Sequence, residues 1–482
     1  MDGRIIFKRF ENCERLQGRR GVKKSRALFL GIAAVGVLAG CSVGPDYQRP
    51  GIEPPKTWSG AQGREEWPGL TWWRDFHAEE LDRLMAAAHD SNFDLAIAVA
   101  RLKQANAQAA IAGAPLLPQL DAGAQAERLR SPPNTPQGSK LFSAGLSASY
   151  ELDFWGQLRD QAEAARLTAT ASAFDRETAE LTLQSAVANS YFSLLSLNER
   201  IVLAENNLKA SEDVLDAYQA RLEVGAASAL DVAQQENVVA TQRAVLPPLI
   251  EQQRQARDAL ALLVGITPEG LAAPAGNLAA VRLPGVSPGL PSGLLQRRPD
   301  VQSAEARLQA SNQNVKAATA ALFPSITLTA QGGSASSSLS DLFKPSGVFY
   351  SLVAGASQPI FHGGALEGGQ LLAEGQYDEQ VATYRKAVVS AFVDVEDALA
   401  AIEQEGRREE ADKVVVSTAQ RAYDIAQAQL YNGTIDILTV LNTQRTLFQA
   451  QDDLAQARLA HAQAVIGLFR ALGGGWQGPE EG

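Results

Sequence analysis

The chain has 482 residues, of which 45% are hydrophobic and 20% are charged, and its formal net charge is -11. This composition excludes a wholly disordered chain, because disorder needs low hydrophobicity together with high net charge. The acidic balance argues against a general nucleic-acid binder, which needs a basic face for phosphates. Aromatic residues make up only 6% of the chain. Ala, Gln and Leu fill its long segments instead, a bias that suits closely packed long helices.

The N-terminus carries the pattern of a bacterial lipoprotein signal. A basic region over residues 19–26 precedes the apolar run 27–39, which ends in Leu38-Ala39-Gly40-Cys41. That run is too short to span a bilayer comfortably but fits a signal-peptide core. We therefore expect cleavage before Cys41 and a covalent lipid on this residue. A plain secretory signal or a membrane anchor with an incidental cysteine is the alternative.

The cysteine content and the hydrophobicity of the rest of the chain agree with an exported protein. The chain has two cysteines: Cys13 would be removed with the signal and Cys41 would carry the lipid, so no disulfide is expected. No later segment of the sequence resembles a transmembrane helix. If the exported chain crosses a membrane it must do so as β-structure, because only helices and closed barrels satisfy their backbone groups in lipid.

The sequence is an internal duplication with an offset of 206 to 208 residues. Each half predicts a helix, two strands and two long helices, and the Pro/Gly-rich stretch 265–291 separates the halves. Four anchors repeat in the same order: Ala100-Arg101-Leu102 with Ala306-Arg307-Leu308, Leu117-Pro118 with Phe323-Pro324, Phe154-Trp155-Gly156 with Phe361-His362-Gly363, and Leu222 to Gly225 with Leu430 to Gly433.

Four segments alternate between apolar and small polar residues, which predicts half-buried strands. They begin near Gln119, Phe142, Ser325 and Val348, and the polar stretches 131–140 and 334–345 are the expected loops. Periodicity does not say whether the apolar face meets lipid or a protein core, and a sheet on a soluble core is the alternative. The export signal favours lipid outside and water inside. Four strands cannot close a barrel alone, so several copies of the chain must share one wall.

The long helical segments repeat their apolar residues every seven positions. Val187, Leu194, Ile201, Leu208, Leu215 and Leu222 share one register, and Leu441, Phe448, Ala455, Ala462 and Phe469 share another. A strict seven-residue repeat predicts left-handed supercoiling around partner helices. At 1.5 Å per residue, a helix from Gly156 to Gly225 would run roughly 100 Å. Polar Gln444, Gln451 and Arg458 fall between the apolar pairs, which favours a hollow wall over a solid bundle.

These features together resemble the TolC-like outer-membrane factors, in particular the OprM/NodT-type efflux lipoproteins, over essentially the whole exported chain. The resemblance rests on these sequence motifs: Val43-Gly44-Pro45-Asp46-Tyr47, Trp72-Trp73, Tyr150 to Gly156, Arg297 to Val301, Phe323 to Ile326 and Leu472 to Trp476. The resemblance implies a mostly α-helical chain that adds four strands to a 12-stranded outer-membrane barrel. This barrel would be shared by a homotrimer and continue into a long periplasmic α-helical barrel.

The resemblance also implies the function and the partners. The chain would be the outer-membrane channel of a tripartite RND-type efflux pump, docked to a periplasmic adaptor and an inner-membrane transporter. It would conduct drugs or other small molecules passively, without an enzymatic step. The expected divisions are a signal peptide (1–40), a lipid-anchored extension (41–71), a first repeat (72–264), a linker (265–292), a second repeat (293–472) and a tail (473–482).

The candidate site residues lie where the long helices reverse. Gly225 and Gly433 supply the backbone freedom for the two turns, which the resemblance makes the docking rim for the adaptor, together with Asp231. The family's aperture residues correspond to Leu438, Asn442 and Arg445. Relatives commonly place an aspartate at position 442, so a neutral Asn442 predicts a less acidic aperture here. Asp231 is also a candidate helix cap.

The other polar residues predict no catalysis and no cofactor besides the lipid. His77, His89, His362 and His461 lack metal-ligand spacing, and no nucleophile–base motif or phosphate loop stands out. Two alternatives to a drug duct remain: a duct for metal ions or exported proteins, and a lipid-anchored periplasmic coiled-coil scaffold without a pore. Met85 is the sole methionine after Cys41, which disfavours a methionine-lined copper or silver duct. The cargo and the identity of the adaptor cannot be deduced from the sequence.

Overall fold

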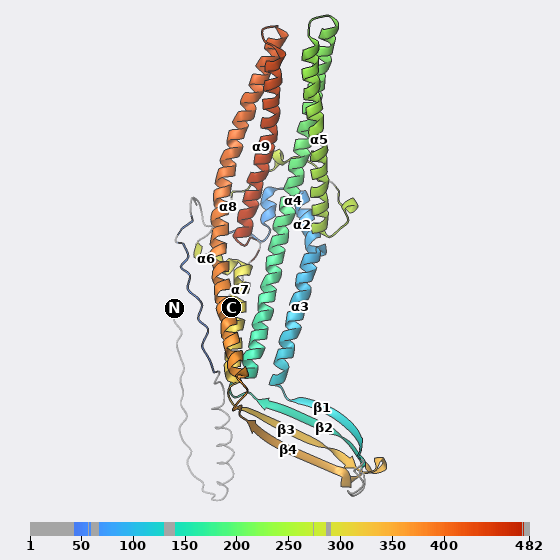
Figure 1. Ribbon diagram of the computed structural model, residues 1–482, viewed down its shortest axis with the longest axis vertical. Helices are drawn as coiled ribbons and strands as arrows, with labels where there is room; N and C mark the ends of the chain where they lie inside the picture. The colour runs from blue at the N-terminus through green and yellow to red at the C-terminus, as the bar shows by residue number, and fades with distance from the viewer. Residues whose placement is uncertain are drawn as a thin grey trace, which may run out of the picture.

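The computed structural model describes residues 43–55, 57–58, 67–129, 140–272, 274–285, 291–474 and 476. The chain is a long rod with a sheet at one end and the turns of two helical hairpins at the other (Figure 1). The predicted signal peptide and Cys41 lie outside the described residues, as does most of the first predicted strand loop.

Both halves contain the predicted order of helix, two strands and two long helices. The first half comprises α2 (Glu79–Ser91), α3 (Phe93–Gly113), β1 (Gln119–Arg128), β2 (Lys140–Leu152), α4 (Gln157–Glu223) and α5 (Ala229–Val264). The second comprises α6 (Pro291–Arg297), α7 (Pro299–Ala320), β3 (Ser325–Ser336), β4 (Val348–Ser357), α8 (Ala365–Tyr431) and α9 (Ile437–Ala471). The longest helices, α4 and α8, have 67 residues each, so the duplication preserves length as well as order.

The four strands form one antiparallel sheet in the order β1-β2-β3-β4. Its register aligns Leu120, Ala148, Ala330 and Leu352 in one row, so the apolar residues of all four strands share one face. Leu120 and Leu352 are largely exposed in the single chain. The outer edges of β1 and β4 pair with no further strand in the described part of the chain. The sheet therefore presents both an uncovered apolar face and two open edges.

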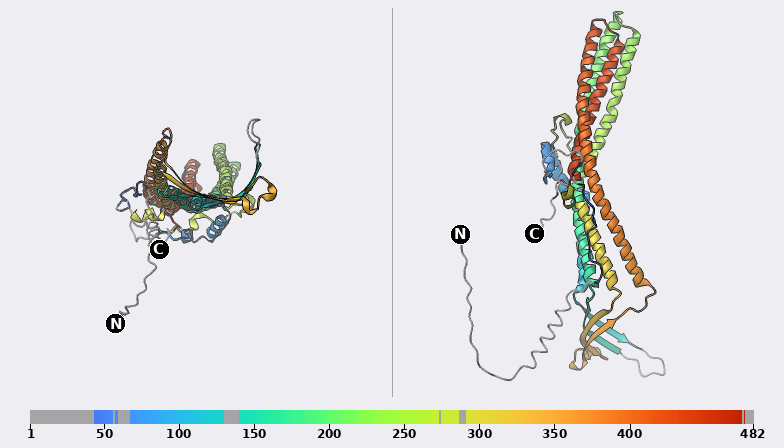
Figure 2. Two further views of the ribbon diagram at one scale, coloured as in Figure 1. Left: turned by 90° about the horizontal axis from the view of Figure 1, so that it is seen from below. Right: turned by 90° about the vertical axis from the view of Figure 1, so that its left-hand side faces the viewer.

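A row of glycines lets the sheet curve, as the view from below shows (Figure 2). Gly123, Gly145 and Gly333 stand opposite one another on three adjacent strands. A Cβ added to Gly145 would lie 2.6 Å from the carbonyl oxygen of Gly332, and one on Gly333 would lie 2.4 Å from that of Ala144. No side chain fits at either position, because the neighbouring backbone fills that space.

The predicted loop 334–345 begins too early. Strand β3 continues to Ser336, because Ser334 and its neighbours still pair with β2 and β4. The Ser334 hydroxyl also donates to the carbonyl of Leu342, which ties the following loop back onto the strand end. A run of small polar residues therefore does not mark a loop here, because its backbone partners are supplied by the strands on both sides.

A buried aromatic group holds the middle of the rod together. Trp72, Phe76, Phe192 and Phe469, which we call the waist core, come from the short helix η1 (Trp72–Phe76), α4 and α9. The Trp72 and Phe469 rings stack with centroids 4.8 Å apart, and those of Phe76 and Phe192 lie 5.0 Å apart. The linker between the halves packs here too, through Leu271 and Leu278. These contacts fix the two repeats to each other.

The N-terminal extension is a strap along α7 and α8. Arg49 donates to the Tyr384 hydroxyl at 3.0 Å and pairs with Glu305, which also accepts from the Tyr47 hydroxyl at 3.3 Å. Burial, and then the negative charge of Glu305, raise the pKa of Tyr47. At the beginning of the strap, the Val43 amide donates to the carbonyl of Trp155 at 3.4 Å. The strap thus starts beside the junction of β2 and α4.

The seven-residue repeat of α4 forms a buried seam near the waist. Val187, Leu194 and Ile201 are buried, whereas Leu222 near the far end is partly exposed. Of the polar positions noted on α9, Gln444 is completely buried between the helices of the single chain. The interhelical register decides this burial, because the Gln444 amide lies beside Ser211 of α4 and Tyr423 of α8.

Candidate functional site

The two helix turns predicted from glycine lie together at the end of the rod away from the sheet (Figure 1). Gly225 follows α4 with φ 74°, and Gly433 follows α8 with φ 70°, both in the left-handed region. The Gly225 amide donates to Leu222 and the Gly433 amide to Leu430, each at 3.0 Å. A Cβ at either glycine would meet open space. The requirement for glycine is therefore conformational, as at many helix ends.

The next helix of each hairpin starts with a side-chain cap. Ser228 and Asp231 form a capping box at the start of α5, in which the Ser228 amide donates to the Asp231 carboxylate at 2.8 Å. This geometry agrees with the expectation that Asp231 is a cap. At the start of α9, Asp436 accepts from the amide of Thr439 at 3.0 Å and from its hydroxyl at 2.8 Å. These two hydrogen bonds lower the pKa of Asp436.

Sequence reasoning missed the Asp436 cap, although the signal was present. An aspartate immediately before an apolar helical run is a preferred N-cap residue. Asp436 and Ser228 occupy equivalent places in the two halves and accept from the third residue of the following helix. The two hairpins are thus built by the same rules at both turns.

The three predicted aperture residues share one face of α9. Leu438, Asn442 and Arg445 follow one another at intervals of four and three, which places them on one side of the helix. All three are exposed in the single chain, Leu438 to 51%. Arg445 donates to the Asn442 side-chain oxygen at 3.4 Å. The structure therefore gathers these residues into one exposed stripe next to the hairpin turn.

The opposite face of α9 joins the two hairpins. Ile437 and Leu441 are buried against Tyr218 of α4 and Val232 of α5. Burial raises the pKa of the Tyr218 hydroxyl, and the Arg221 guanidinium lies 5.7 Å from the centre of its ring. Any movement of α9 that carries the exposed stripe must also change this packing.

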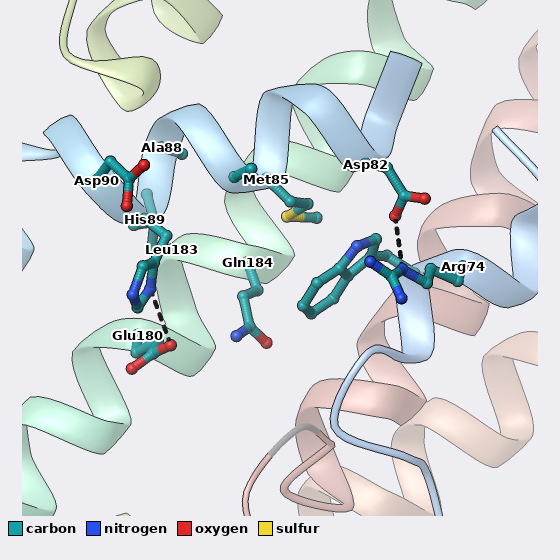
Figure 3. A pocket seen from close by; sticks show the side chains of 11 residues that line it. Arg74, Asp82, Met85, Ala88, His89, Asp90, Glu180, Leu183 and Gln184 are labelled. Carbon is teal, nitrogen blue, oxygen red and sulfur yellow. Dashed lines mark hydrogen bonds and ion pairs between the residues drawn. The ribbon is translucent and has the colours of Figure 1, made fainter. Parts of the chain in front are cut away.

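A separate cavity of about 240 Å³ lies between α2 and α4 at the waist (Figure 3). Trp73, Met85 and Leu183 are among its apolar lining residues, and two polar pairs lie at its sides. The pairs are Arg74 with Asp82 at 3.3 Å and His89 with Glu180 at 3.1 Å. These pairs hold α2 in place, and they contain no nucleophile with a base oriented by a third group.

Neither a metal-binding cluster nor a membrane-spanning helix occurs among the described residues. Among the residues that the structure describes, no three His, Cys, Asp or Glu side chains are grouped so as to hold a metal ion. His461 instead contacts Glu409 across α8 and α9, with 2.8 Å between Nδ1 and the carboxylate. Burial alone would raise the pKa of Glu409, but hydrogen bonds from His461 and Lys413 lower it. Within the described ranges, every helix is too short or too polar to cross a membrane.

A rod of paired helices joined to a curved sheet with an uncovered apolar face defines a TolC-like outer-membrane channel subunit. The solved channel OprN matches with a TM-score of 0.85 and 26% identity over 90% of this chain and 99% of that one. The open-state structure of the MtrE channel of Neisseria gonorrhoeae matches with a TM-score of 0.83 and 31% identity, covering 90% of this chain and 98% of that one.

The sequence comparisons agree with the fold. The pattern of the outer membrane efflux protein family matches residues 84–266 and 290–474. The pyoverdine export outer membrane protein OpmQ of Pseudomonas aeruginosa is 41% identical over 463 residues, which is 94% of this chain and 97% of that protein. The chain belongs to the outer membrane efflux protein family, and it is an outer-membrane channel of an efflux system.

Proposed function

We propose that three copies of this chain form the passive exit duct of a tripartite efflux pump. The observation that carries the proposal is the sheet, which has an apolar face and two edge strands without a partner in the described chain. Such edges are not tolerated in hydrocarbon, so strands of other copies must pair with β1 and β4. Three copies would supply 12 strands, as the family resemblance implies. Conduction through this duct involves no enzymatic step.

The hairpin turns are the proposed docking rim for a periplasmic adaptor, which would connect the duct to an inner-membrane transporter. Gly225, Asp231 and Gly433 support this assignment through their geometry, because they hold both turns at the end farthest from the sheet. The rim is in the place that a partner approaching from the inner membrane would reach first.

The exposed stripe of Leu438, Asn442 and Arg445 is the proposed periplasmic aperture. In a closed trimer, three copies of the stripe would meet around the axis, with Leu438 supplying the apolar constriction. Because Asn442 is neutral, Arg445 would supply the charge of the ring that the three stripes form around the axis. Partner binding would open the aperture by a population shift between closed and open packings.

The proposed membrane attachment is a lipid on Cys41. The strap supports this, because Val43 is bound at the junction between the sheet and α4. An acyl chain attached two residues earlier would therefore enter the membrane beside the protein's own sheet. The contacts of Arg49 with Glu305 and Tyr384 hold the strap against α7 and α8, so the lipid attachment point would stay close to the sheet.

The proposed cargo is a secreted small molecule, with a siderophore such as pyoverdine as the first candidate because of the similarity to OpmQ. Cargo selection would rest largely with the inner-membrane transporter. Deletion of the coding sequence separates siderophores from drugs as cargo. A loss of secreted siderophore would indicate the first class, and a gain in drug sensitivity would indicate the second.

Single-channel conductance in planar bilayers, together with the oligomer mass in detergent, tests the duct. We expect a trimer with small, mostly closed conductance that rises several-fold in Leu438→Ala and Arg445→Ala. The matched control is Thr446→Ala, an exposed change on α9 beside the stripe. A monomer that never conducts, and that leaves the membrane in the Cys41→Ser variant, would favour the anchored scaffold instead.

A further inference from the structure

Four buried polar residues meet where the two hairpins pack together. Ser211, Gln235, Tyr423 and Gln444 come from α4, α5, α8 and α9, one residue from each helix, and we call them the glutamine layer. Ser211, Gln235 and Gln444 are fully buried and Tyr423 is nearly so. Buried amide side chains are uncommon, and they are normally hydrogen-bonded at both ends.

The hydrogen bonding of the layer is incomplete. Gln235 Nε2 donates to the Ser211 carbonyl at 2.7 Å, which is a good bond. Gln444 Nε2 reaches only 3.5 Å from both the Ser211 hydroxyl and the Tyr423 hydroxyl. The side-chain oxygens of Gln235 and Gln444 accept no hydrogen bond from any described group. A buried acceptor without a partner is destabilising, because it has lost its water and gained nothing in exchange.

The residues along the helices on both sides of the layer are apolar. Toward the turns lies the group formed by Tyr218, Val232, Ile437 and Leu441, and a second group between α8 and α9, which includes Val440, Leu447 and Phe448, extends past Gln444 in both directions. Gln444 occupies a buried seam position at which leucine would match these neighbours. The glutamine layer is therefore a weak level among apolar neighbours, while it still fixes the register of the two hairpins.

The layer also lies directly behind the proposed aperture. Gln444 stands between Asn442 and Arg445 in the sequence of α9 but points to the opposite side, into the hairpin interface. An outward movement of α9 would carry the stripe with it and would admit water to the amides of the layer. The unsatisfied oxygens would then gain partners, so a packing with the hairpins apart would recover hydrogen bonds that the packing in this structure lacks.

We propose that the glutamine layer is a built-in release for the aperture: its incomplete hydrogen bonding lowers the free energy needed to separate the hairpins, and so raises the open population. This inference rests on the proposed gating function. It assigns a positioning role to Gln444 and Gln235, which act through α9 and do not themselves line the opening.

Gln444→Leu tests the proposal, because leucine keeps the volume and removes the unsatisfied oxygen. We expect the open probability in planar bilayers to fall about tenfold, the change that one unsatisfied buried acceptor implies. Amide hydrogen exchange in residues 437–450 should slow by a similar factor. Gln235→Leu should act in the same direction, and Gln444→Met provides a second variant if leucine impairs trimer assembly.

Gln451→Leu is the matched control. Gln451 lies one heptad farther from the turn on the same helix, and its side-chain oxygen also has no partner among the described groups, but the residue is only partly buried, whereas Gln444 is fully buried. We expect it to leave the open probability within about twofold of the original chain. Equal suppression by both variants, or none by Gln444→Leu, would overturn the proposal.

The hydrogen-exchange measurement separates this inference from the duct itself. If the original trimer never conducts but exchange over residues 437–450 slows only in Gln444→Leu, the duct proposal fails and the layer remains the weak level of the seam. If the trimer conducts and exchange is unchanged in Gln444→Leu, the duct proposal stands and the role of the layer is refuted.

Discussion

The waist and the hairpin tips are built from the same helices but differ in what they bury. The waist core stacks Trp72 and Phe76 on Phe192 and Phe469, and the linker covers it. Near the tips, the interface between hairpins includes Tyr218, Val232, Ile437 and Leu441 together with the glutamine layer. A close-packed aromatic core resists deformation, whereas a narrow seam with unsatisfied amides separates at lower cost. The waist is thus the region with the larger aromatic core, and the proposed release lies at the tips.

The largest expected effect is at the waist. Phe469→Ala should lower the free energy of unfolding by about 3–5 kcal/mol, because it leaves a cavity beside Trp72 that rigid neighbours cannot fill. Leu441→Ala near the tips should cost about 2 kcal/mol, the low end for such changes, because its seam relaxes more easily. Thermal melting followed by circular dichroism measures both. A larger loss in Leu441→Ala would contradict the distinction between the two regions.

An intermediate effect is expected at the helix turns. Gly433→Ala should destabilise the chain by about 1 kcal/mol, because an alanine in the left-handed region is strained even where space is open. Gly375→Ala is the control, since Gly375 lies exposed within α8 with open space around a Cβ. That change should be neutral or stabilising, because alanine favours helix. The comparison fails if both substitutions shift the melting temperature in the same direction.

The smallest effect is the pH dependence of the contact between Glu409 of α8 and His461 of α9. The pKa of Glu409 is lowered in the folded chain, so its contribution to stability is present above its ordinary pKa and is lost as the pH falls through the folded value. Glu409→Gln should therefore melt at a lower temperature than the original chain at pH 7. The difference should shrink as the medium becomes acidic enough to protonate the carboxylate.

Glu410→Gln is the control for this pH dependence. Glu410 pairs with the same Lys413 at 2.7 Å, but its side chain is 74% exposed, and exposed pairs contribute little. Melting curves of the three chains from pH 7 to pH 3 give the comparison. A constant difference between Glu409→Gln and the original chain across that range would mean that the carboxylate charge contributes nothing.

Much of this fold follows from the sequence by itself. Alternation over residues 142–154 predicted β2, the seven-residue repeat between Gly156 and Gly225 predicted α4, and the duplicated anchors predicted the second half. Gly225, Gly433 and Asp231 were identified from local chemistry, because turns and caps depend on neighbouring residues in the chain. The roles of the aperture stripe in gating and of Cys41 in attachment stay predictions.

Only the tertiary structure decided how distant segments meet. The strap contacts of Arg49 with Tyr384 and the covering of the waist by Leu278 have no signal in local patterns. Gln444 is the clearest case: its sequence position marked only a polar residue between apolar pairs, and the structure buries it beside Ser211 of α4 and Tyr423 of α8. Periodicity gives the faces of one helix, but the rotation and register of each helix against the others depend on the packing of all of them together.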